Sequence, residues 1–449
     1  MKKLVFASAM ALASMSLATA PPLRAQDSSQ ISLPADQYNA YQNAITQTDP
    51  AAKASALESF LQTYPQTQVK TGVLTQLIQT YQQLNQPAQV LSAATRLLQV
   101  DPTNFQAIFV SVFVKKQQCS QSLDASGSST DPQTCDDAAA LAQKGLTVPK
   151  PAGTSGDDWK KLTGAAYPLF HSALALDDAI SKKDYKAAVA EYTAELMLYS
   201  DAQTQTSGLA DTLLLAEAYT KPDAKDLVKA VWFYARVWNF APPAYKAQIG
   251  PKLEYYYKKY HGALDGLDAI KTQAAATTFP PGTLVITPAK TPAEQIHDLL
   301  ATTPDLTKLA LTDKETVLAL GSKDDADRLW VLLKDKTTPV PGIVLEASAL
   351  VIKVAVTQDA KDAKVPDFIV NLKAPLPAKE IPAAGFEFGL AAKGQAELDG
   401  TYDTYAQTPA TATTAQTAQI VLREGFIQPE KKKPVPPHKP AAGHRATAN

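Results

Sequence analysis

The sequence predicts a multidomain α + β protein, in which an all-α solenoid of helical repeats precedes a small five-stranded β-barrel. The chain has 449 residues, 45% of them hydrophobic and 19% charged. Because single cores stop growing near roughly 250 to 300 residues, two or three domains are expected. Apolar residues recur at helical spacing between about residues 36 and 278 and with a period of two from residue 336. The change of period places a helical domain before a domain of strands.

Residues 1–25 have the layout of a secretory signal. Lys2 and Lys3 precede an apolar stretch, residues 4–17, that is too short to span a bilayer. We expect cleavage after Ala25 and a chain that is exported to the periplasm or the exterior. No cysteine near that junction could carry a lipid anchor. A retained signal anchor is the alternative.

Charge is distributed unevenly along the chain. The formal net charge is −1, and residues 429–449 hold five basic residues against one acidic residue. The preceding body is therefore acidic, and we expect no nucleic-acid partner because phosphates attract cations. The proline-rich tail is expected to be disordered. It either contacts anionic envelope polymers weakly or is a solvated end without a partner.

A repeat is visible from Thr71 to Asn104. Two sets of apolar residues mark one face of each of two helices: Leu74, Leu77, Ile78 and Tyr81, and then Val90, Ala94 and Leu97. Pro102 ends the second helix. These offsets resemble the tetratricopeptide repeat, a helix pair that packs internally and against the next pair. The resemblance implies a stack of pairs with a concave surface.

Further segments with similar spacing predict five or six pairs in series, more than the about three that a stable stack needs. They are residues 41–45 with 57–64, 105–113 with 136–146, 174–180 with 184–196, and 215–219 with 230–237. An irregular helical bundle is the alternative.

Two cysteines, Cys119 and Cys135, bracket a segment rich in Ser, Gly, Asp and Pro, which is typical of an exposed loop. In an oxidising compartment the simplest interpretation of such a pair is a disulfide. A redox-active pair would more often be Cys-x-x-Cys, and a metal site would need further ligands.

An aromatic group supplies the candidate partner-binding residues. Tyr255, Tyr257 and Tyr260 follow Trp232 and Trp238 in the chain. Consecutive residues on a helix point about 100° apart, so some of these rings must face outward or onto a neighbouring helix. The functional interpretation is an amphipathic platform for a peptide or sugar. The alternative, which we favour, is packing against the preceding helix pair.

After residue 278 the composition changes. Residues 279–335 predict a connector with short helices, and residues 336–428 predict a β-domain. The expected strands are residues 342–347, 349–356, 365–372, 396–405 and 416–425. The β-domain resembles the OB-like fold of the tRNA-anticodon-binding-like family. The resemblance is carried by a helix with Trp330, a strand that begins after Pro341 at Gly342, and a later strand with Gly400 and Tyr402. The prolines of residues 374–382 depart from the helix that many OB folds have there.

The chain contains, in this order, a signal, helix pairs, a Phe-Pro-Pro-Gly-Thr-Leu connector and a β-domain. This order is similar to that of exported tetratricopeptide proteins of Acidobacteria. OB barrels often bind oligonucleotides or sugars through aromatic residues. Here acidic residues accompany the aromatics, so we interpret those aromatics as core residues of a small barrel.

No motif assigns a catalytic residue, a metal ligand or a cofactor. The chain has no Gly-x-Ser-x-Gly, His-Glu-x-x-His, Gly-Lys-Ser or Gly-Lys-Thr sequence. We therefore predict a non-enzymatic adaptor that needs no cofactor and binds a protein or peptide through its helical repeats. The first alternative is a carbohydrate- or peptidoglycan-binding module that uses the β-domain or the Tyr255–Tyr260 cluster. A hydrolase of the cell envelope is a third option.

Overall fold

The computed structural model describes residues 32–124, 128–303, 305–408 and 416–429. The predicted signal, residues 1–25, and residues 430–449 of the predicted tail lie outside these ranges. The chain divides into two compact units, one ending at Ala289 and one beginning at Lys290. Each unit is described by itself.

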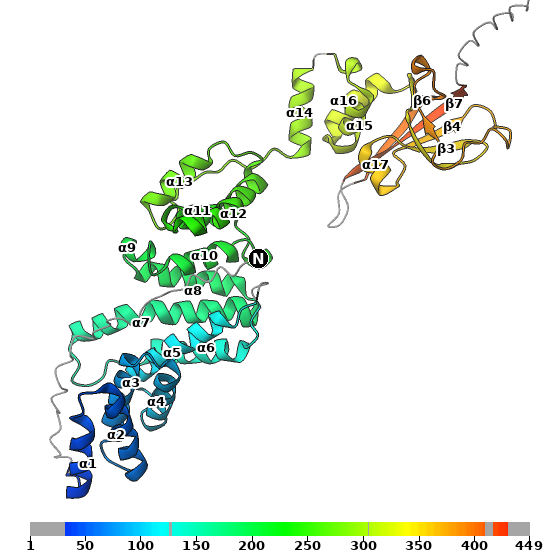
Figure 1. Ribbon diagram of the computed structural model, residues 1–449. Coiled ribbons are helices and arrows are strands. Elements are labelled where there is room, and N and C mark those ends of the chain that lie inside the picture. The colour runs from blue at the N-terminus through cyan, green and yellow to red at the C-terminus, as the bar shows by residue number, and fades with distance from the viewer. Residues whose placement is uncertain (1–31, 125–127, 304, 409–415, 430–449) are drawn as a thin grey trace, which may run out of the picture. The chain divides into compact units, whose positions relative to one another are not determined.

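The first unit is a series of helices that follow one another in sequence order (Figure 1). They are α1 (Ala35–Ile45), α2 (Pro50–Thr63), α3 (Lys70–Gln83), α4 (Pro87–Val100), α5 (Phe105–Gln121), α6 (Pro132–Thr147), α7 (Gly156–Asp177), α8 (Tyr185–Leu198), α9 (Asp201–Thr204), α10 (Leu209–Ala218), α11 (Leu227–Phe240), α12 (Pro243–His261) and α13 (Leu267–Ala276). A π-helix, η1 (Asp178–Lys182), follows α7, and a 3-10 turn, η2 (Pro222–Ala224), precedes α11.

Successive helices pack as antiparallel pairs, and each pair packs on the next. The pairs are α1 with α2, α3 with α4, α5 with α6, α7 with α8, and α10 with α11, while α12 and α13 both pack on α11. The expectation of a helical-repeat region is confirmed. Leu74, Leu77 and Ile78 are fully buried in α3, as are Ala94 and Leu97 in α4.

Local sequence explains where these helices begin. Asp49 accepts a hydrogen bond from Ala52 N at 2.7 Å, and Asn104 accepts one from Ala107 N at 3.0 Å. Such caps satisfy amide groups that have no partner within the helix. Pro50 and Pro87 occupy the first positions of α2 and α4, where the missing N–H costs nothing.

The predicted pairing of Cys119 and Cys135 is present as a disulfide between the end of α5 and the start of α6. Both cysteines are 1% exposed, and Leu176 of α7 and Ile180 of η1 pack against them. The disulfide therefore links α5 to α6 covalently at a place where the π-helix packs against it.

The second unit contains one mixed sheet and several short helices. Its strands are β1 (Thr337–Pro339), β2 (Gly342–Ala347), β3 (Val351–Ala355), β4 (Phe368–Leu372), β5 (Glu387–Phe388), β6 (Glu397–Thr408) and β7 (Thr417–Gln428), and its α-helices are α14 (Pro292–Thr302), α15 (Leu311–Leu320), α16 (Lys323–Leu333) and α17 (Gln358–Ala363). Short 3-10 turns, η3 (Leu306–Lys308) and η4 (Ala391–Lys393), lie between them.

The strand order is β1-β6-β7-β4-β3-β2-β5, with β4 and β7 parallel and the other pairs antiparallel. In the sheet, β1 lies at one end of the strand order and β2 lies next to the strand at the opposite end. In the sequence the two strands are close, because β1 ends at Pro339 and β2 begins at Gly342. The sheet therefore curls until Val340 and Pro341 join its two ends.

The five expected strands correspond to β2, β3, β4, β6 and β7. The sheet itself differs from the predicted five-stranded barrel, because β1 and β5 extend it to seven strands. These two strands span three and two residues, too few to produce a recognisable alternation of apolar residues.

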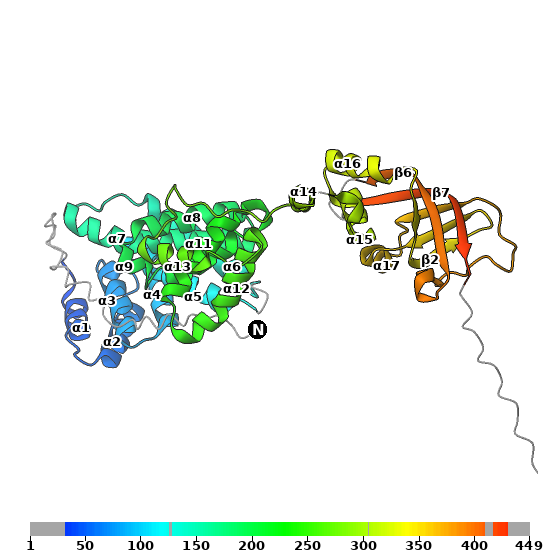
Figure 2. The same ribbon diagram turned by 90° about the horizontal axis from the view of Figure 1, so that it is seen from above.

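The short helices expected in the connector are α14, α15 and α16, and they share a hydrophobic core with the sheet. Ile296, Val317 and Leu329 are buried in the same cluster as Val344 and Phe368. Helix α15 packs along β6 and β7 (Figure 2). Residues 290–335 thus belong to the second unit, whereas the extended residues 281–289 belong to the first.

Candidate functional site

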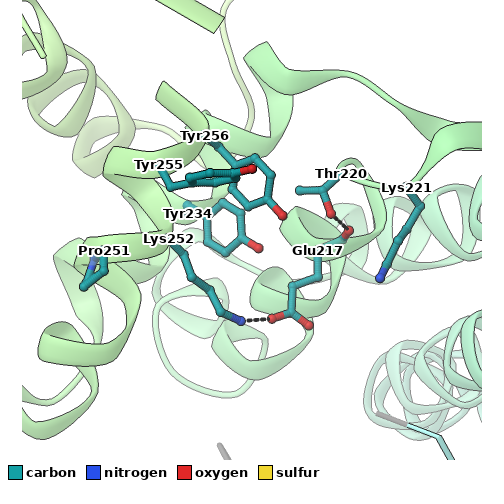
Figure 3. Close-up of a pocket in the computed structure, with 8 residues that line it drawn as sticks. All are labelled: Glu217, Thr220, Lys221, Tyr234, Pro251, Lys252, Tyr255 and Tyr256. Carbon is teal, nitrogen blue, oxygen red and sulfur yellow. Dashed lines mark hydrogen bonds and ion pairs between the residues drawn. The ribbon is translucent and has the colours of Figure 1, made fainter. Parts of the chain in front are cut away.

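A pocket of about 380 Å³ lies in the first unit where α10, α11 and α12 meet (Figure 3). Its lining residues are Glu217, Thr220, Lys221, Tyr234, Pro251, Lys252, Tyr255 and Tyr256. We call it the tyrosine pocket. α10 begins one helix pair and α12 begins the next, so the pocket marks the junction of two successive pairs.

Three aromatic rings form one wall of the tyrosine pocket. Lys252, Tyr255 and Tyr256 share a face of α12, because residues three and four positions apart are neighbours on a helix. The ring of Tyr234 from α11 stacks on Tyr256, with centroids 5.5 Å apart and planes 8° apart. Tyr255 meets Tyr256 edge to face at 5.0 Å. Tyr255 is the outer ring and is 56% exposed.

Charged groups complete the tyrosine pocket. Lys252 Nζ lies 2.5 Å from Glu217 Oε1, an ion pair that Figure 3 shows below the tyrosine rings. More than a third of each side chain is exposed, so the pair contributes about 1 kcal/mol or less to stability. The ammonium group of Lys221 lies 5.3 Å from the ring centroid of Tyr185.

The chemistry available here is recognition of a side chain. Burial raises the pKa of Tyr234, so its hydroxyl keeps its proton and can donate a hydrogen bond. Glu217 can accept, and Lys221 and Lys252 can donate with charge assistance. Combined with the exposed ring of Tyr255, these groups can hold an aromatic or polar side chain.

The structure separates the predicted partner-binding residues. Tyr255 lines the pocket, whereas Tyr260 and Trp238 are half-buried and lie outside it. The connector covers the backbone of Tyr260, whose carbonyl accepts from Ala289 N at 2.7 Å. Lys271 Nζ lies 4.6 Å from the ring centroid of Trp238.

The other two candidates lie in the core, as the favoured alternative of packing against neighbouring helices expects, and they are not part of a binding surface. Trp232 has no exposed area, and its Nε1 donates to the Thr278 carbonyl at 3.2 Å. Tyr257 is 3% exposed, and its hydroxyl donates to the Asp265 carbonyl at 2.7 Å. Both side chains pack in the core of the helical unit and are not available to a partner.

Sequence reasoning did not assign a binding role to Glu217, Lys221 or Lys252, and it included Tyr256 only as a member of the Tyr255–Tyr260 cluster. The spacing of Lys252 and Tyr256 beside Tyr255 was a usable signal, because all three share one face of α12. No local pattern predicts the contact of Glu217 with Lys252, since these residues come from different helices 35 positions apart.

The described residues contain neither a cluster of side chains that could bind a metal ion nor a helix that could span a membrane. In residues 32–124, 128–303, 305–408 and 416–429, no group of three or more His, Cys, Asp or Glu side chains is placed to hold a metal ion. Within those same ranges no helix combines the length and apolar character needed to cross a bilayer.

These features define a helical-repeat protein with a second unit built on a curled sheet. No protein-family model and no curated protein matches the chain. Among solved structures, the TPR protein TTC0263 of Thermus thermophilus is 16% identical, with 49% of this chain and 98% of that chain covered and a TM-score of 0.25. PilW, a type IV pilus biogenesis factor, is 14% identical, with 53% and 99% covered and a TM-score of 0.28. At these TM-scores neither likeness carries an argument, and the helical-repeat class rests on the helix pairs themselves.

Proposed function

We propose that this protein is an exported, non-enzymatic adaptor that binds a protein or peptide partner through the first helices of its repeats. The observation that carries the proposal is the position of the tyrosine pocket. Its charged residues come from α10, from the turn after α10 and from α12, and the exposed ring of Tyr255 lies at its edge. Side chains that converge at such a junction favour recognition of an extended segment running across several pairs.

The size of the pocket supports a peptide side chain as its occupant. Pockets for small molecules and cofactors hold about 300 to 1,000 Å³, and the tyrosine pocket, at about 380 Å³, is near the lower end. Tyr255 supplies contact area and a hydroxyl with only two side-chain torsions to order. Residues of this kind are enriched where proteins bind one another.

A carbohydrate-binding module is the second candidate, and the exposure of Tyr255 favours it. An open aromatic ring beside Glu217 and Lys252 is an arrangement on which a sugar can stack while its hydroxyl groups form hydrogen bonds. The ammonium group of Lys259 lies 5.5 Å from the centroid of the Tyr255 ring and competes for its face. A sugar needs the open face of the ring for stacking, whereas a peptide side chain can also contact the edge of the ring, so we prefer the peptide as the ligand.

For the second unit we propose an OB-like fold. The curl of the sheet, with β1 and β2 joined through residues 340–341, supports a barrel-like arrangement. Trp330 packs against Tyr402 and Tyr405, with ring centroids 5.8 and 4.8 Å apart. These contacts favour a structural role for the aromatics of the sheet.

The test uses the mature chain, residues 26–449, to select binders from a library of random 12-residue peptides. Selected peptides are then titrated calorimetrically against the wild type, Tyr255→Ala and Tyr38→Ala. Tyr38 is a matched control because it is 51% exposed on α1, outside the pocket. We expect Tyr255→Ala to weaken binding about ten-fold or more, as truncation of an interface anchor does, and Tyr38→Ala to have no effect.

Peptidoglycan fragments are titrated in the same way. Binding of these fragments that requires Tyr255, without any selected peptide, would replace the adaptor proposal with the carbohydrate one. Equal losses in the two tyrosine variants would remove the tyrosine pocket from the proposal.

A further inference from the structure

A second pocket lies elsewhere on the helical unit, between α6, α7 and η1, with a volume of about 460 Å³. Its apolar wall is formed by Ala139, Ala140 and Leu174. Its polar residues are Asp136, Gln143, Asp177, Ser181 and Lys182. We call it the aspartate pocket. None of its residues lines the tyrosine pocket.

The aspartate pocket contains a buried acceptor without a donor. The Asp177 side chain is only 2% exposed, and its Oδ2 pairs with Lys182 Nζ at 2.9 Å. Asp177 Oδ1 is buried without a hydrogen-bond partner among the described residues other than a proton carried by Asp136, and Asp177 lines the pocket. A buried carboxylate oxygen left unsatisfied costs free energy, so this atom points to a missing ligand rather than to a solvated acidic surface.

Asp136 stands next to Asp177, and two ionised carboxylates can only accept hydrogen bonds. A proton on Asp136 can bridge the two groups, which raises the pKa of Asp136 above its ordinary value. The hydroxyl of Ser181 is also buried without a partner. Two carboxyl groups and a hydroxyl thus border one space, in which a proton on Asp136 takes the place of a cationic donor between the two carboxyl groups.

The elements around the pocket hold these acceptors in place. Asp136 follows the disulfide-bonded Cys135 in the first turns of α6. Ser181 lies in η1, and π-helical turns are rare and frequent at functional sites. Ile180 of the same π-helix packs against the disulfide. The disulfide therefore anchors the start of α6, which carries Asp136, to α5, and the π-helix that carries Ser181 packs against it.

We propose that the aspartate pocket binds the guanidinium group of an arginine side chain from a partner protein. Asp136 and Asp177 Oδ1 accept its N–H groups, and Ala139, Ala140 and Leu174 contact its aliphatic stem. A planar guanidinium presents five donors and can serve both carboxylates at once. It is also less strongly hydrated than an ammonium group, which suits a partly buried site that already contains the ammonium group of Lys182.

The identification of the arginine as part of a protein rests on the proposed adaptor function, whereas the pocket can be tested with a small probe. The probe is N-acetyl-arginine N-methylamide, titrated into the mature chain and followed by ligand-observed NMR. The matching citrulline and lysine compounds are titrated in parallel. Citrulline has nearly the shape of arginine without its charge.

Three variants report on the site. Asp136→Asn removes one acceptor charge at an exposed position, and Ala140→Phe fills the pocket without changing its charge. Asp157→Asn is the control, because it removes an exposed charge from the far end of α7. Circular dichroism verifies that each variant is folded.

We expect a dissociation constant on the order of 1 mM for the arginine probe and much weaker binding of citrulline and lysine. Asp136→Asn should weaken the arginine probe about ten-fold, Ala140→Phe should abolish its binding, and Asp157→Asn should leave it unchanged. Equal binding of citrulline or lysine, equal effects of the two Asp→Asn variants, or no binding to the wild type would each overturn the proposal. Tyr255→Ala should leave this binding intact, so failure at one pocket is distinguishable from failure at the other.

Discussion

Lys116 Nζ lies 3.1 Å from Asp211 Oδ2, although the two residues are 95 positions apart in the sequence. The pair joins α5 to α10, and Ser172 of α7 donates to the same Asp211 oxygen at 2.6 Å. Burial alone would raise the pKa of Asp211, but Lys116 together with the hydrogen bonds from Glu195 and Ser172 outweighs burial and holds that pKa below its ordinary value. A buried polar network therefore connects three helix pairs of the stack.

Removal of Lys116 should destabilise the helical unit strongly. Lys116→Met leaves the Asp211 carboxylate buried without its cation, and breaking a buried pair in this way costs about 3 to 5 kcal/mol. The matched control is Lys115→Met, because Lys115 pairs with the more exposed Asp137 at 2.8 Å. That loss should cost about 1 kcal/mol or less. Urea unfolding followed by circular dichroism compares the two, and equal costs would contradict the role of the network.

The second unit should lose stability as pH rises. Glu315 is 3% exposed, and neither carboxyl oxygen has a hydrogen-bond partner. Burial, with a contribution from Asp367, raises the pKa of Glu315 to about 9 from an ordinary value of 4.5. Between these two values the folded state binds the proton more tightly than the unfolded state, so the free energy of unfolding falls as pH rises through this window.

Glu315→Gln removes this titration while it keeps the size of the side chain. The melting temperature of the wild-type second unit should fall between pH 5 and pH 8 by more than that of the variant. Parallel pH profiles for the two proteins would show that Glu315 does not carry the dependence.

Loss of the disulfide should lower stability without removing helices. Cys119 and Cys135 are 16 positions apart, and closing a loop of about this length contributes roughly 3 kcal/mol in the chain-entropy model. Cys119→Ser should therefore lower the melting temperature and leave the far-ultraviolet circular dichroism nearly unchanged. Titration of two free thiols in the unreduced, unfolded wild type would rule the disulfide out.

The disulfide variant should also weaken the arginine probe at the aspartate pocket, because Cys135 precedes Asp136. Binding at the tyrosine pocket, which no part of the disulfide lines, provides the internal control.

Export should leave a mature chain that begins at Gln26. Lys2, Lys3 and the short apolar stretch after them are the basis of this expectation. Fractionation and N-terminal sequencing of the protein from its own cells test it. An intact N-terminus held in the membrane would instead support the retained anchor.

The helical repeats were predictable because their core residues follow local periodicity. Leu74, Leu77 and Ile78 are spaced for one face of a helix, and all three are buried. The π-helix at Asp178–Lys182 was not predicted, since one widened turn barely disturbs the spacing of apolar residues. The sequence also could not show that α14 to α16 pack on the sheet, because a helical pattern does not specify its packing partner.

The candidate sites were less predictable than the fold. Helical spacing shows that Tyr255 and Tyr257 point in different directions, but not which of them faces the core. The structure decides this point, since Tyr257 is buried and Tyr255 is exposed. Contacts such as Glu217 with Lys252 depend on how successive pairs stack, a relationship that no local pattern encodes.

Site-specific photo-crosslinking in the native cells tests the central claim most directly. The photoreactive residue p-benzoylphenylalanine replaces Tyr255 in one strain and the comparably exposed Tyr38 in another. The adaptor account predicts that position 255 forms a discrete adduct in which mass spectrometry finds a peptide of another protein joined at that residue, and that position 38 forms none. Absence of any protein adduct at position 255, or the same adducts at both positions, would contradict it.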